Sequence, residues 1–376
     1  MAHAFLDIAP SAPRRAMVAC PRPAGDRPAP SLEWFEASHP FPNQASVEAA
    51  ARALAIARES RDADGTLLVL LSGGASSMLT APCEGIALAD KIATARSLMN
   101  AGLAIGELNC VRKHLSRIKG GRLAAEAGRT VTLAISDVHA PVADDPSVIG
   151  SGPTVADPTT FAQAVSIVAT VGGVPGSVRA HLERGAAGVE RETVKPGDPR
   201  LAATAFEILG NRLTALAGAK QAAESAGYRV VVIDEATSGE ARAAAVQFVK
   251  RAAAAAARTP GPVCVVAAGE TTVTVTGRGL GGRNQEFALA AVPTVHSLGE
   301  DVVVASVGTD GADGPTDAAG AIVDRTTLER SARLGLDWAA VLADNDAYRF
   351  FAPLGDLLRW GATGTNVGDV QLFLRA

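Results

Sequence analysis

Short apolar runs rich in β-branched residues alternate with amphipathic helical stretches through most of this 376-residue chain. The apolar runs cover residues 66–71, 130–135, 229–233, 263–267 and 301–306, and they are typical of buried parallel strands. Helical periodicity marks residues 46–58, 87–100, 105–126, 239–257 and 282–292. This alternation predicts an α/β protein made of α/β/α layers with mostly parallel sheets.

The length of the chain predicts two domains, each with ample material for a core. Residues 194–200 read Val-Lys-Pro-Gly-Asp-Pro-Arg, which is the composition most typical of a linker in this sequence. We therefore expect domains at 1–200 and 201–376. A boundary near Ala236 is the alternative.

Composition excludes several classes of protein. Hydrophobic residues make up 48% of the chain and charged residues 20%, which indicates a folded globular protein. A net charge of −4 argues against a nucleic-acid-binding surface. The alanine run at 252–257 predicts a helix rather than a membrane span, and residues 1–17 contain no continuous apolar segment of a signal peptide. The four cysteines lie far apart, as expected for reduced thiols of a cytoplasmic protein.

Polar glycine-containing loops follow the predicted strands, and ligands of open α/β sheets bind at the carboxyl ends of strands. Asp137 ends one strand, Glu270 and Asp310 follow two others, and a Ser-Gly-Gly sequence starts at Ser72 after the first. We expect these loops to line one cleft between the two domains. The place of Asp137 is usual for a catalytic base.

Two segments of the first half are candidates for anion binding. Ser72, Gly73 and Gly74 offer backbone N–H groups and a hydroxyl to a phosphate, although a plain strand–helix turn has the same composition. Lys113 and Lys119 belong to a basic stretch that ends at a glycine pair. They either converge on a polyphosphate or lie on a solvated face, and solvation is the usual fate of an isolated basic stretch.

The Gly-Arg-Gly-Leu-Gly-Gly sequence at 277–282 formally matches a dinucleotide-binding fingerprint. The acidic residue that should follow about 20 positions later must end a strand, whereas Asp301 precedes its strand. Arg283 at the helix start would instead face an anion directly, because a guanidinium binds phosphate or carboxylate in a fork. We interpret the loop as a phosphate or carboxylate site. No Walker A sequence is present, which excludes a P-loop kinase.

Asp310, Asp313 and Asp317 lie within eight residues and offer hard oxygen ligands. Mg²⁺ needs only one or two carboxylates together with phosphate oxygens. The alternative is a glycine-proline turn in which aspartates bond the backbone. The spacing fits no EF-hand. The Thr-Gly-Thr-Asn-Val-Gly-Asp sequence at 363–369 is either a plain loop before a last strand at 370–374 or part of the same site.

Taken together, these segments resemble the glycerate 2-kinase family, also called MOFRL proteins and often labelled hydroxypyruvate reductase. The matching segments, which follow the order of the family and cover nearly the whole chain, are Ala-Ser-His-Pro at 37–40, Ser-Gly-Gly at 72–74, Asn-Cys-Val-Arg-Lys-His at 109–114, Lys-Gly-Gly-Arg at 119–122, Ser-Asp at 136–137, Ser-Gly-Pro at 151–153, Gly-Glu-Thr at 269–271, Gly-Gly-Arg-Asn-Gln-Glu at 281–286, Thr-Asp-Gly at 309–311, Gly-Pro-Thr-Asp at 314–317 and Thr-Gly-Thr-Asn at 363–366.

The resemblance implies a two-domain α/β enzyme with a Rossmann-like N-terminal domain, which phosphorylates the 2-hydroxyl of D-glycerate from ATP with Mg²⁺. Asp137 would accept or position the hydroxyl proton, and Arg283 would hold the glycerate carboxylate or stabilise the transferring phosphoryl group. Asp310 and Asp317 would belong to the metal site. The residues implied in substrate or phosphate binding are Ser72, Gly73, Gly74, Lys113, Lys119, Ser151, Glu270, Gly281, Gly282, Asn284, Thr365 and Asn366. A homodimer is the expectation at family level.

The sequence departs from the family at its beginning. Family members usually open with a helix, a strand and a Gly-Lys-Ala loop, whose lysine belongs to the active site, and residues 1–5 here align inside the helix that follows. Loss of such a lysine is expected to lower the rate on the order of 10²–10³-fold. One alternative is therefore a truncated nucleotide-binding protein with weak activity. The older label of the family gives the other, a hydroxypyruvate reductase that uses NAD(P)H. Residues 139–143 also lengthen the loop after Asp137.

Overall fold

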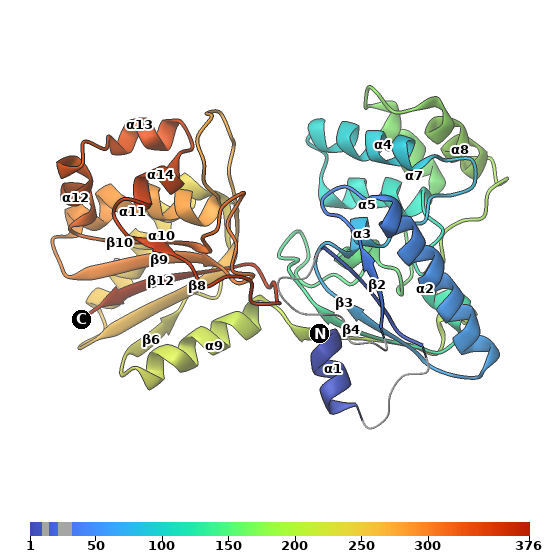
Figure 1. Cartoon of the computed structure of the whole chain (residues 1–376), viewed down its shortest axis with the longest axis horizontal. Helices are drawn as coiled ribbons and strands as arrows, with labels where there is room; N and C mark the ends of the chain where they lie inside the picture. The colour runs from blue at the N-terminus through green and yellow to red at the C-terminus, as the bar shows by residue number, and fades with distance from the viewer. Residues whose placement is uncertain (10–14, 22–31) are drawn as a thin grey trace. The chain divides into compact units, whose positions relative to one another are not determined.

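The computed structural model describes residues 1–9, 15–21 and 32–376, which form two compact units (Figure 1). The first unit comprises Met1–Ile135 and Asp144–Leu209, and the second comprises Ser136–Ala143 and Gly210–Ala376. The units therefore divide at 209/210 rather than at 200, and residues 136–143 belong to the second unit. The predicted linker packs inside the first unit, where Val194 is buried and its N–H donates to the carbonyl of Gly120 at 3.0 Å.

The first unit contains a sheet of order β3-β4-β5, in which β3 (Leu67–Leu71) runs parallel to β4 (Thr130–Ile135) and β5 (Thr204–Gly210) follows. Strands β1 (Met17–Cys20) and β2 (Glu33–Glu36) form a separate parallel pair. The helices of this unit are α1 (Ala2–Ile8), α2 (Gln44–Asp62), α3 (Ala75–Met78), α4 (Leu88–Asn100), α5 (Ile105–His114), α6 (Arg122–Ala127), α7 (Phe161–Ala169) and α8 (Gly176–Ala186), with short 3₁₀ turns η1 (Ile149–Ser151) and η2 (Pro199–Leu201).

The helix predicted over 105–126 is wrong as a single element, because it is two helices, α5 and α6. Gly120 and Gly121 lie between them with φ angles of 58° and 77°, in the left-handed region that glycine adopts without strain. A Cβ atom on Gly121 would lie 2.9 Å from the Cβ of Val194. The glycine pair therefore allows both the turn and the close approach of the chain beside it.

The second unit is built on a sheet of order β11-β10-β9-β12-β8-β6, with β7 also paired to β8. Its strands are β6 (Arg229–Val232), β7 (Thr237–Glu240), β8 (Val263–Thr272), β9 (Val302–Gly308), β10 (Gly320–Asp324), β11 (Leu357–Leu358) and β12 (Asp369–Arg375). The predicted α/β class is confirmed, and β6, β8 and β9 share one direction as expected. The sheet is nevertheless mixed, because β12 runs antiparallel to β8 and β9, and β10 runs antiparallel to β9.

Helices cover both faces of this sheet (Figure 1). Val263, Val265 and Ala267 of β8 pack in the core with α10 (Ala241–Ala257) and α11 (Arg283–Leu298). The alternate residues of the same strand, including Val266, pack instead with Leu216 of α9 (Arg212–Ser225). A strand buried on both faces reads as a continuous apolar run, which is why its periodicity is invisible in the sequence. The remaining helices are α12 (Thr327–Arg333), α13 (Trp338–Ala343) and α14 (Ala347–Phe351).

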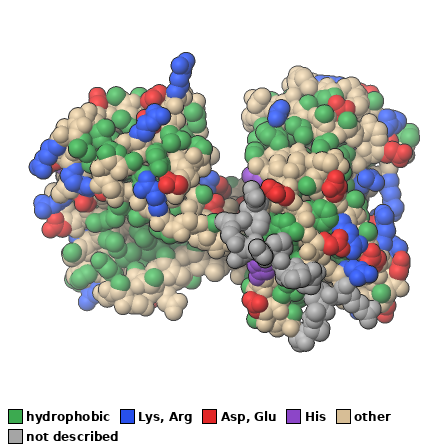
Figure 2. All heavy atoms as spheres, viewed as in Figure 1, with side chains coloured by type: hydrophobic (Ala, Val, Ile, Leu, Met, Phe, Trp, Pro, Cys, Tyr) green, Lys and Arg blue, Asp and Glu red, His purple; other side chains and the backbone are tan. Residues whose placement is uncertain are grey.

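On the face drawn in Figure 2, acidic side chains are interspersed with lysine and arginine over each unit. This distribution agrees with a net charge of −4. Among the described residues, no helix is long and apolar enough to cross a membrane. Cys83, Cys110 and Cys264 are buried and Cys20 is partly buried, and all four are free thiols.

Candidate functional site

Several predicted site residues of the second unit, among them Asp137, Glu270, Arg283 and Asp310, lie near one edge of its sheet. Asp369, the first residue of β12, is paired in register with Gly269 of β8 and Gly308 of β9. Because β12 is antiparallel to both neighbours, its first residue lies beside the last residue of β9 and beside the residue three positions before the last of β8. Glu270 and Asp310 are consequently brought to the same edge as Asp369. A Cβ atom on Gly308 would lie 2.7 Å from the carbonyl oxygen of Ala312, so glycine is required there.

Arg283, the first residue of α11, is held between two carboxylates at this edge. Its Nε and Nη2 donate to the Oδ2 and Oδ1 of Asp369 at 2.6 and 2.9 Å, and its Nη1 lies 2.8 Å from the Oε1 of Glu270. Asp369 is fully buried, whereas the side chains of Arg283 and Glu270 are 32% and 40% exposed. Burial acts to lower the pKa of Arg283, but the hydrogen bonds and charge of Asp369, together with Glu270, raise it overall. The guanidinium is therefore firmly charged.

The surroundings of Glu270 are dominated by negative charge. Burial raises the pKa of this carboxyl above its usual value, and the charges of Asp369, Asp137 and Asp310 raise it further against the opposing effect of Arg283. Three other carboxylates thus act on Glu270, and Arg283 supplies the opposing positive charge. Within the described ranges, no group of three or more His, Cys, Asp or Glu side chains is arranged to hold a metal ion.

Asp137 lies beside the loop that precedes β12. The Nδ2 of Asn366 is 3.4 Å from the Oδ2 of Asp137, and its Oδ1 accepts the N–H of Gly368 at 3.0 Å. Thr309, just beyond β9, accepts the N–H of Val367 at 2.9 Å through its hydroxyl, which donates to the carbonyl of Gly368 at 2.7 Å. Bonds of this kind fix the loop that carries Asn366 against the end of β9. Thr365, in the same loop, is exposed.

The glycine-rich loop at 277–280 has its backbone donors filled by the chain itself. Asn345 accepts the N–H of Gly277 at 3.0 Å through Oδ1, Asp344 accepts that of Arg278 at 2.9 Å, and Asp346 accepts that of Leu280 at 2.7 Å. The sequence interpretation of this part of the loop as an anion site is therefore corrected. Its N–H groups do donate to side chains, but these are the amide of Asn345 and the carboxylates of Asp344 and Asp346, in the turn between α13 and α14.

The glycines of this loop are explained by the same contact. A Cβ atom on Gly277 would lie 2.1 Å from the carbonyl oxygen of Asp344, and one on Gly279 would lie 2.4 Å from the Cβ of Asp346. Such distances are impossible, so glycine is needed for close packing of two loops rather than for approach of a pyrophosphate. The formal match to the dinucleotide fingerprint therefore has a structural origin.

The start of α11 is capped by a buried carboxylate. Asp313 accepts the backbone N–H groups of Asn284 at 3.0 Å and Gln285 at 2.8 Å, as an N-cap side chain does. Burial raises the pKa of Asp313 to about 6 despite these hydrogen bonds. Asn284 is itself buried, and its amide bonds Asp313 and the hydroxyl of Ser306. This side chain therefore supports the helix start, and its predicted ligand contact stays a prediction.

The two residues predicted to bear on a metal have different surroundings. Asp310 follows β9, where its Oδ1 accepts the N–H of Ala312 at 3.1 Å, and its charge acts on Glu270. Asp317 is paired with Arg359, whose Nε lies 3.1 Å from both carboxylate oxygens, and it accepts the hydroxyl of Tyr348 at 2.7 Å. Hydrogen bonds from Tyr348 and Arg359 lower the pKa of Asp317. Asp310 is thus grouped with the carboxylates near Arg283, and the metal role of both residues stays a prediction.

In the first unit, Ser72 and Gly73 follow β3, and Gly74 begins α3 with a φ of 77°. The ammonium of Lys119 lies beneath this loop and donates to the carbonyls of Ser76 at 2.7 Å and Leu79 at 3.1 Å. Lys119 is buried, and the loss of hydration lowers its pKa well below the usual value. Lys119 thus supports the segment that follows the loop, and its predicted contact with a phosphate stays a prediction.

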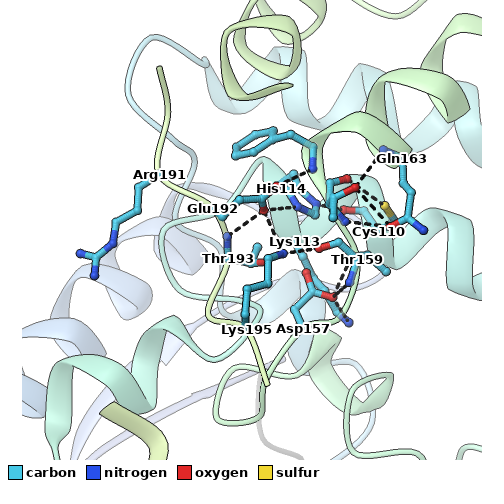
Figure 3. Close-up of polar contacts among 12 residues, drawn as sticks. Cys110, Lys113, His114, Asp157, Thr159, Gln163, Arg191, Glu192, Thr193 and Lys195 are labelled. Atoms are coloured by element: carbon cyan, nitrogen blue, oxygen red, sulfur yellow. Dashed lines mark hydrogen bonds and ion pairs between the residues drawn. The ribbon is translucent and has the colours of Figure 1, made fainter. Parts of the chain in front are cut away.

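Lys113 and Ser151 are also buried among protein groups. Figure 3 shows Lys113 directed toward Asp157, with Nζ and Oδ1 3.3 Å apart and both side chains nearly inaccessible. The hydroxyl of Ser151 donates to Asn109 at 2.9 Å and lies 2.8 Å from that of Ser76. Both side chains therefore join segments of the first unit to one another, and their predicted ligand contacts stay predictions.

The sequence interpretation assigned no role to Asp369, although this residue ends the polar segment noted at 363–369. Its signal in the sequence is weak because it begins a strand, whereas ligand-binding loops are expected after strand ends. Gly281 and Gly282 directly precede Arg283, and their predicted contact with an anion stays a prediction. In the described part of the chain, their N–H groups donate to no side chain.

Two family models match this chain, and relatives that are named for an enzymatic activity cover most of it. A family model described as a domain of unknown function, DUF4147, matches residues 1–183, and the MOFRL family model matches residues 263–369. A protein named glycerate 2-kinase from Pyrococcus horikoshii is 40% identical over 349 residues, covering 91% of this chain and 77% of the relative. A D-glycerate 2-kinase from Thermotoga maritima is 34% identical over 379 residues, covering 100% of this chain and 87% of the relative.

A solved structure shows the same architecture. The crystal structure of glycerate kinase from Thermotoga maritima superposes with a TM-score of 0.85 at 34% identity, covering 96% of this chain and 85% of that one. The sequence and structural similarities extend over both units and include the segments that form the sheet edge around Arg283. The chain therefore belongs to the glycerate 2-kinase family.

Proposed function

We propose that this chain is a glycerate 2-kinase, which transfers the γ-phosphoryl group of ATP to the 2-hydroxyl of D-glycerate. The observation that carries the proposal is Arg283 at the start of α11, paired with the buried Asp369. The chain that contains it is similar, over 91% and 100% of its length, to two proteins named as glycerate 2-kinases. A guanidinium has five N–H donors, of which three are used by Asp369 and Glu270. Two donors of Arg283 are left for a carboxylate or phosphoryl oxygen.

The catalytic residues are Asp137 and Arg283. In the transfer step the 2-hydroxyl oxygen forms a bond to the γ-phosphorus, the bond from that phosphorus to the bridging oxygen of ADP breaks, and the hydroxyl proton passes to Asp137. The amide of Asn366 orients Asp137 through its contact at 3.4 Å. Arg283 offsets the negative charge of the anion that it binds.

Mg²⁺ fits the donor set at this edge, because the charged groups that act on Glu270 are, apart from Arg283, all carboxylates, and Mg²⁺ prefers oxygen ligands. When bound, the ion neutralises charge on the transferring phosphoryl group. One or two protein carboxylates suffice beside the phosphate oxygens of the nucleotide. Asp310 is the better ligand of the two predicted, because Asp317 is already paired with Arg359.

The glycine loops supply the remaining contacts. Ser72, Gly73 and Gly74 offer backbone donors in the first unit, while Gly281, Gly282 and Thr365 lie next to Arg283 or Asn366 in the second. The proposal also includes a cytoplasmic location, and a homodimer as the expectation at family level. The family resemblance leaves open which loop receives ATP and which receives D-glycerate.

A second candidate activity is the reduction of hydroxypyruvate. A relative from Agrobacterium vitis that is 41% identical over 358 residues, covering 92% of this chain and 78% of the relative, is provisionally named a hydroxypyruvate reductase. The fingerprint loop argues against it, because the donors that a pyrophosphate would need are occupied by Asp344, Asn345 and Asp346. The kinase is therefore the better supported of the two.

The deciding experiment incubates the purified chain with ATP, Mg²⁺ and D-glycerate and resolves 2-phosphoglycerate from 3-phosphoglycerate. Formation of 2-phosphoglycerate is expected. Oxidation of NAD(P)H that depends on hydroxypyruvate, without phosphoryl transfer, would overturn the proposal in favour of the reductase. Arg330→Ala is the matched control for Arg283→Ala, because Arg330 also forms a two-pronged ion pair with an aspartate, Asp356, outside the proposed site.

A further inference from the structure

We infer that Asp369 is a positioning residue, which fixes the direction of the Arg283 guanidinium through a buried two-pronged ion pair. The inference rests on the proposed function, in which Arg283 binds an anionic group of a substrate. It assigns a task to a residue that the motif comparison left without one. Asp369 acts only through Arg283 and has no contact with the reacting atoms.

The backbone of Asp369 is fixed on both sides. It pairs with Gly269 of β8 and with Gly308 of β9, so it begins the strand that lies between them. Both register partners are glycines, and neither presents a side chain beside the carboxylate. Because Asp369 is fully buried and both its oxygens accept hydrogen bonds from Arg283, its position is set by the sheet.

The other end of the pair is fixed by the helix. Arg283 is the first residue of α11, and the turn that follows it is capped by Asp313 through the N–H groups of Asn284 and Gln285. Because both backbones are anchored and two parallel hydrogen bonds join the side chains, the guanidinium is held in one orientation. An arginine on an open surface would instead sample many rotamers, and part of the binding free energy would be lost in ordering it.

Glu270 differs from Asp369 in a way that separates their tasks. It contacts only the Nη1 edge of Arg283, and its side chain is 40% exposed against full burial for Asp369. A half-exposed carboxylate can exchange its place with an incoming anion, whereas a buried one cannot leave its partner without stranding a charge. Asp369 is therefore the permanent partner, and the Nη1 edge is the one available for exchange.

The competing explanation is that Asp369 has a purely structural role. The effect of Asp369→Asn on activity, measured in the unmodified chain and in Arg283→Ala, distinguishes this role from positioning. Asp369→Asn keeps the shape of the side chain but removes its charge and one acceptor. We expect kcat/KM for D-glycerate to fall about 10–100-fold, and we expect no further fall when the same change is added to Arg283→Ala. Equal losses in both backgrounds would overturn the inference.

Asp356→Asn is the matched control. It disrupts the pair with Arg330, in which the Nη2 of Arg330 lies 2.7 Å from the Oδ2 of Asp356. We expect this variant to lose stability while kcat/KM stays within about twofold of the unmodified chain, since neither residue of the pair belongs to the proposed site. The kcat/KM values are compared at equal fractions of folded protein, so that a loss of stability is not counted as a loss of activity.

Arg283→Lys serves if Asp369→Asn fails to fold. It keeps one positive charge for the buried carboxylate but lacks the planar fork. A loss of activity close to that of Arg283→Ala would support positioning by two parallel bonds. Full activity of Arg283→Lys would overturn the inference, because a point charge would then be sufficient.

A spectroscopic readout works even if the chain does not phosphorylate glycerate. The ¹⁵Nε–H signal of Arg283 is expected to exchange slowly with water in the unmodified chain and to lose that protection in Asp369→Asn, with Arg330 as the internal reference. Unchanged protection in the variant would overturn the inference. Absence of 2-phosphoglycerate with the protection pattern as expected would instead refute only the proposed function.

Discussion

Asp313 caps the helix that carries Arg283, since its Oδ2 accepts the backbone N–H of Gln285 at 2.8 Å. This carboxylate is nearly inaccessible, and burial raises its pKa to about 6 from an ordinary value of 3.8. The predicted anion site at the start of α11 is thus partly occupied by a residue of the chain itself. The helix terminus still lies directly beside Arg283, so the cap also supports the candidate site.

We predict that Asp313 makes the chain less stable as the pH rises from about 4 to 6. In that window the folded state still holds the proton while the unfolded state has lost it, so the free energy of unfolding falls with pH. The full loss, on the order of 2–3 kcal/mol, is reached above pH 6. Urea unfolding midpoints between pH 4 and 7 measure it, and Asp313→Asn should flatten the profile. An unchanged slope in the variant would contradict the pKa assignment.

We predict that Arg283→Ala lowers kcat/KM about 10²–10³-fold while the chain still folds. The same variant should lose about 3–5 kcal/mol of stability, because Asp369 is left buried without its partner. Denaturant unfolding and the phosphoryl transfer assay measure the two effects. Adding Asp369→Asn should restore part of the stability but none of the activity. Turnover equal to that of the unmodified chain would refute the site assignment.

Much of the second unit could be predicted because its strands are short and apolar and the loops after them are polar. The rule that ligands bind at strand ends placed Asp137, Glu270 and Asp310 near one another. It missed Asp369, which lies at the same edge only because β12 runs in the opposite direction. Strand direction depends on long-range pairing, and local composition does not encode it.

The glycine-rich loops could not be assigned from sequence for a different reason. A loop whose N–H groups bind a phosphate has the same composition as one whose N–H groups bind a distant side chain. Gly277 and its acceptor Asn345 are 68 residues apart, so their contact leaves no local spacing to recognise. Burial of Lys119 and Asn284 was equally invisible, because charged and amide side chains are usually exposed.

We predict that Gly279→Ala destabilises the chain by about 1–3 kcal/mol, since a Cβ atom there would lie 2.4 Å from that of Asp346. Gly218→Ala is the control, because a Cβ atom at this position in α9 would meet nothing within 4 Å. That variant should gain about 0.5–1 kcal/mol from its higher helix propensity. Thermal unfolding of the pair measures both. Equal stability of Gly279→Ala and the unmodified chain would contradict the tight contact between the loops.

We predict that Lys119→Met raises the KM for whichever ligand binds the loop of Ser72, Gly73 and Gly74. The ammonium of Lys119 holds the carbonyls of Ser76 and Leu79, and its loss frees the turn that follows this loop. Methionine fills a similar volume without a charge, so the core beneath the loop stays packed.

Separate KM values for ATP and D-glycerate then identify the ligand of the first unit, since only one of them should rise, by about 10-fold or more for a loss of 1.4 kcal/mol. Lys220→Met on the exposed surface of α9 is the control and should change neither value. If Lys119→Met folds and leaves both KM values unchanged, the loop at 72–74 has no part in binding either substrate.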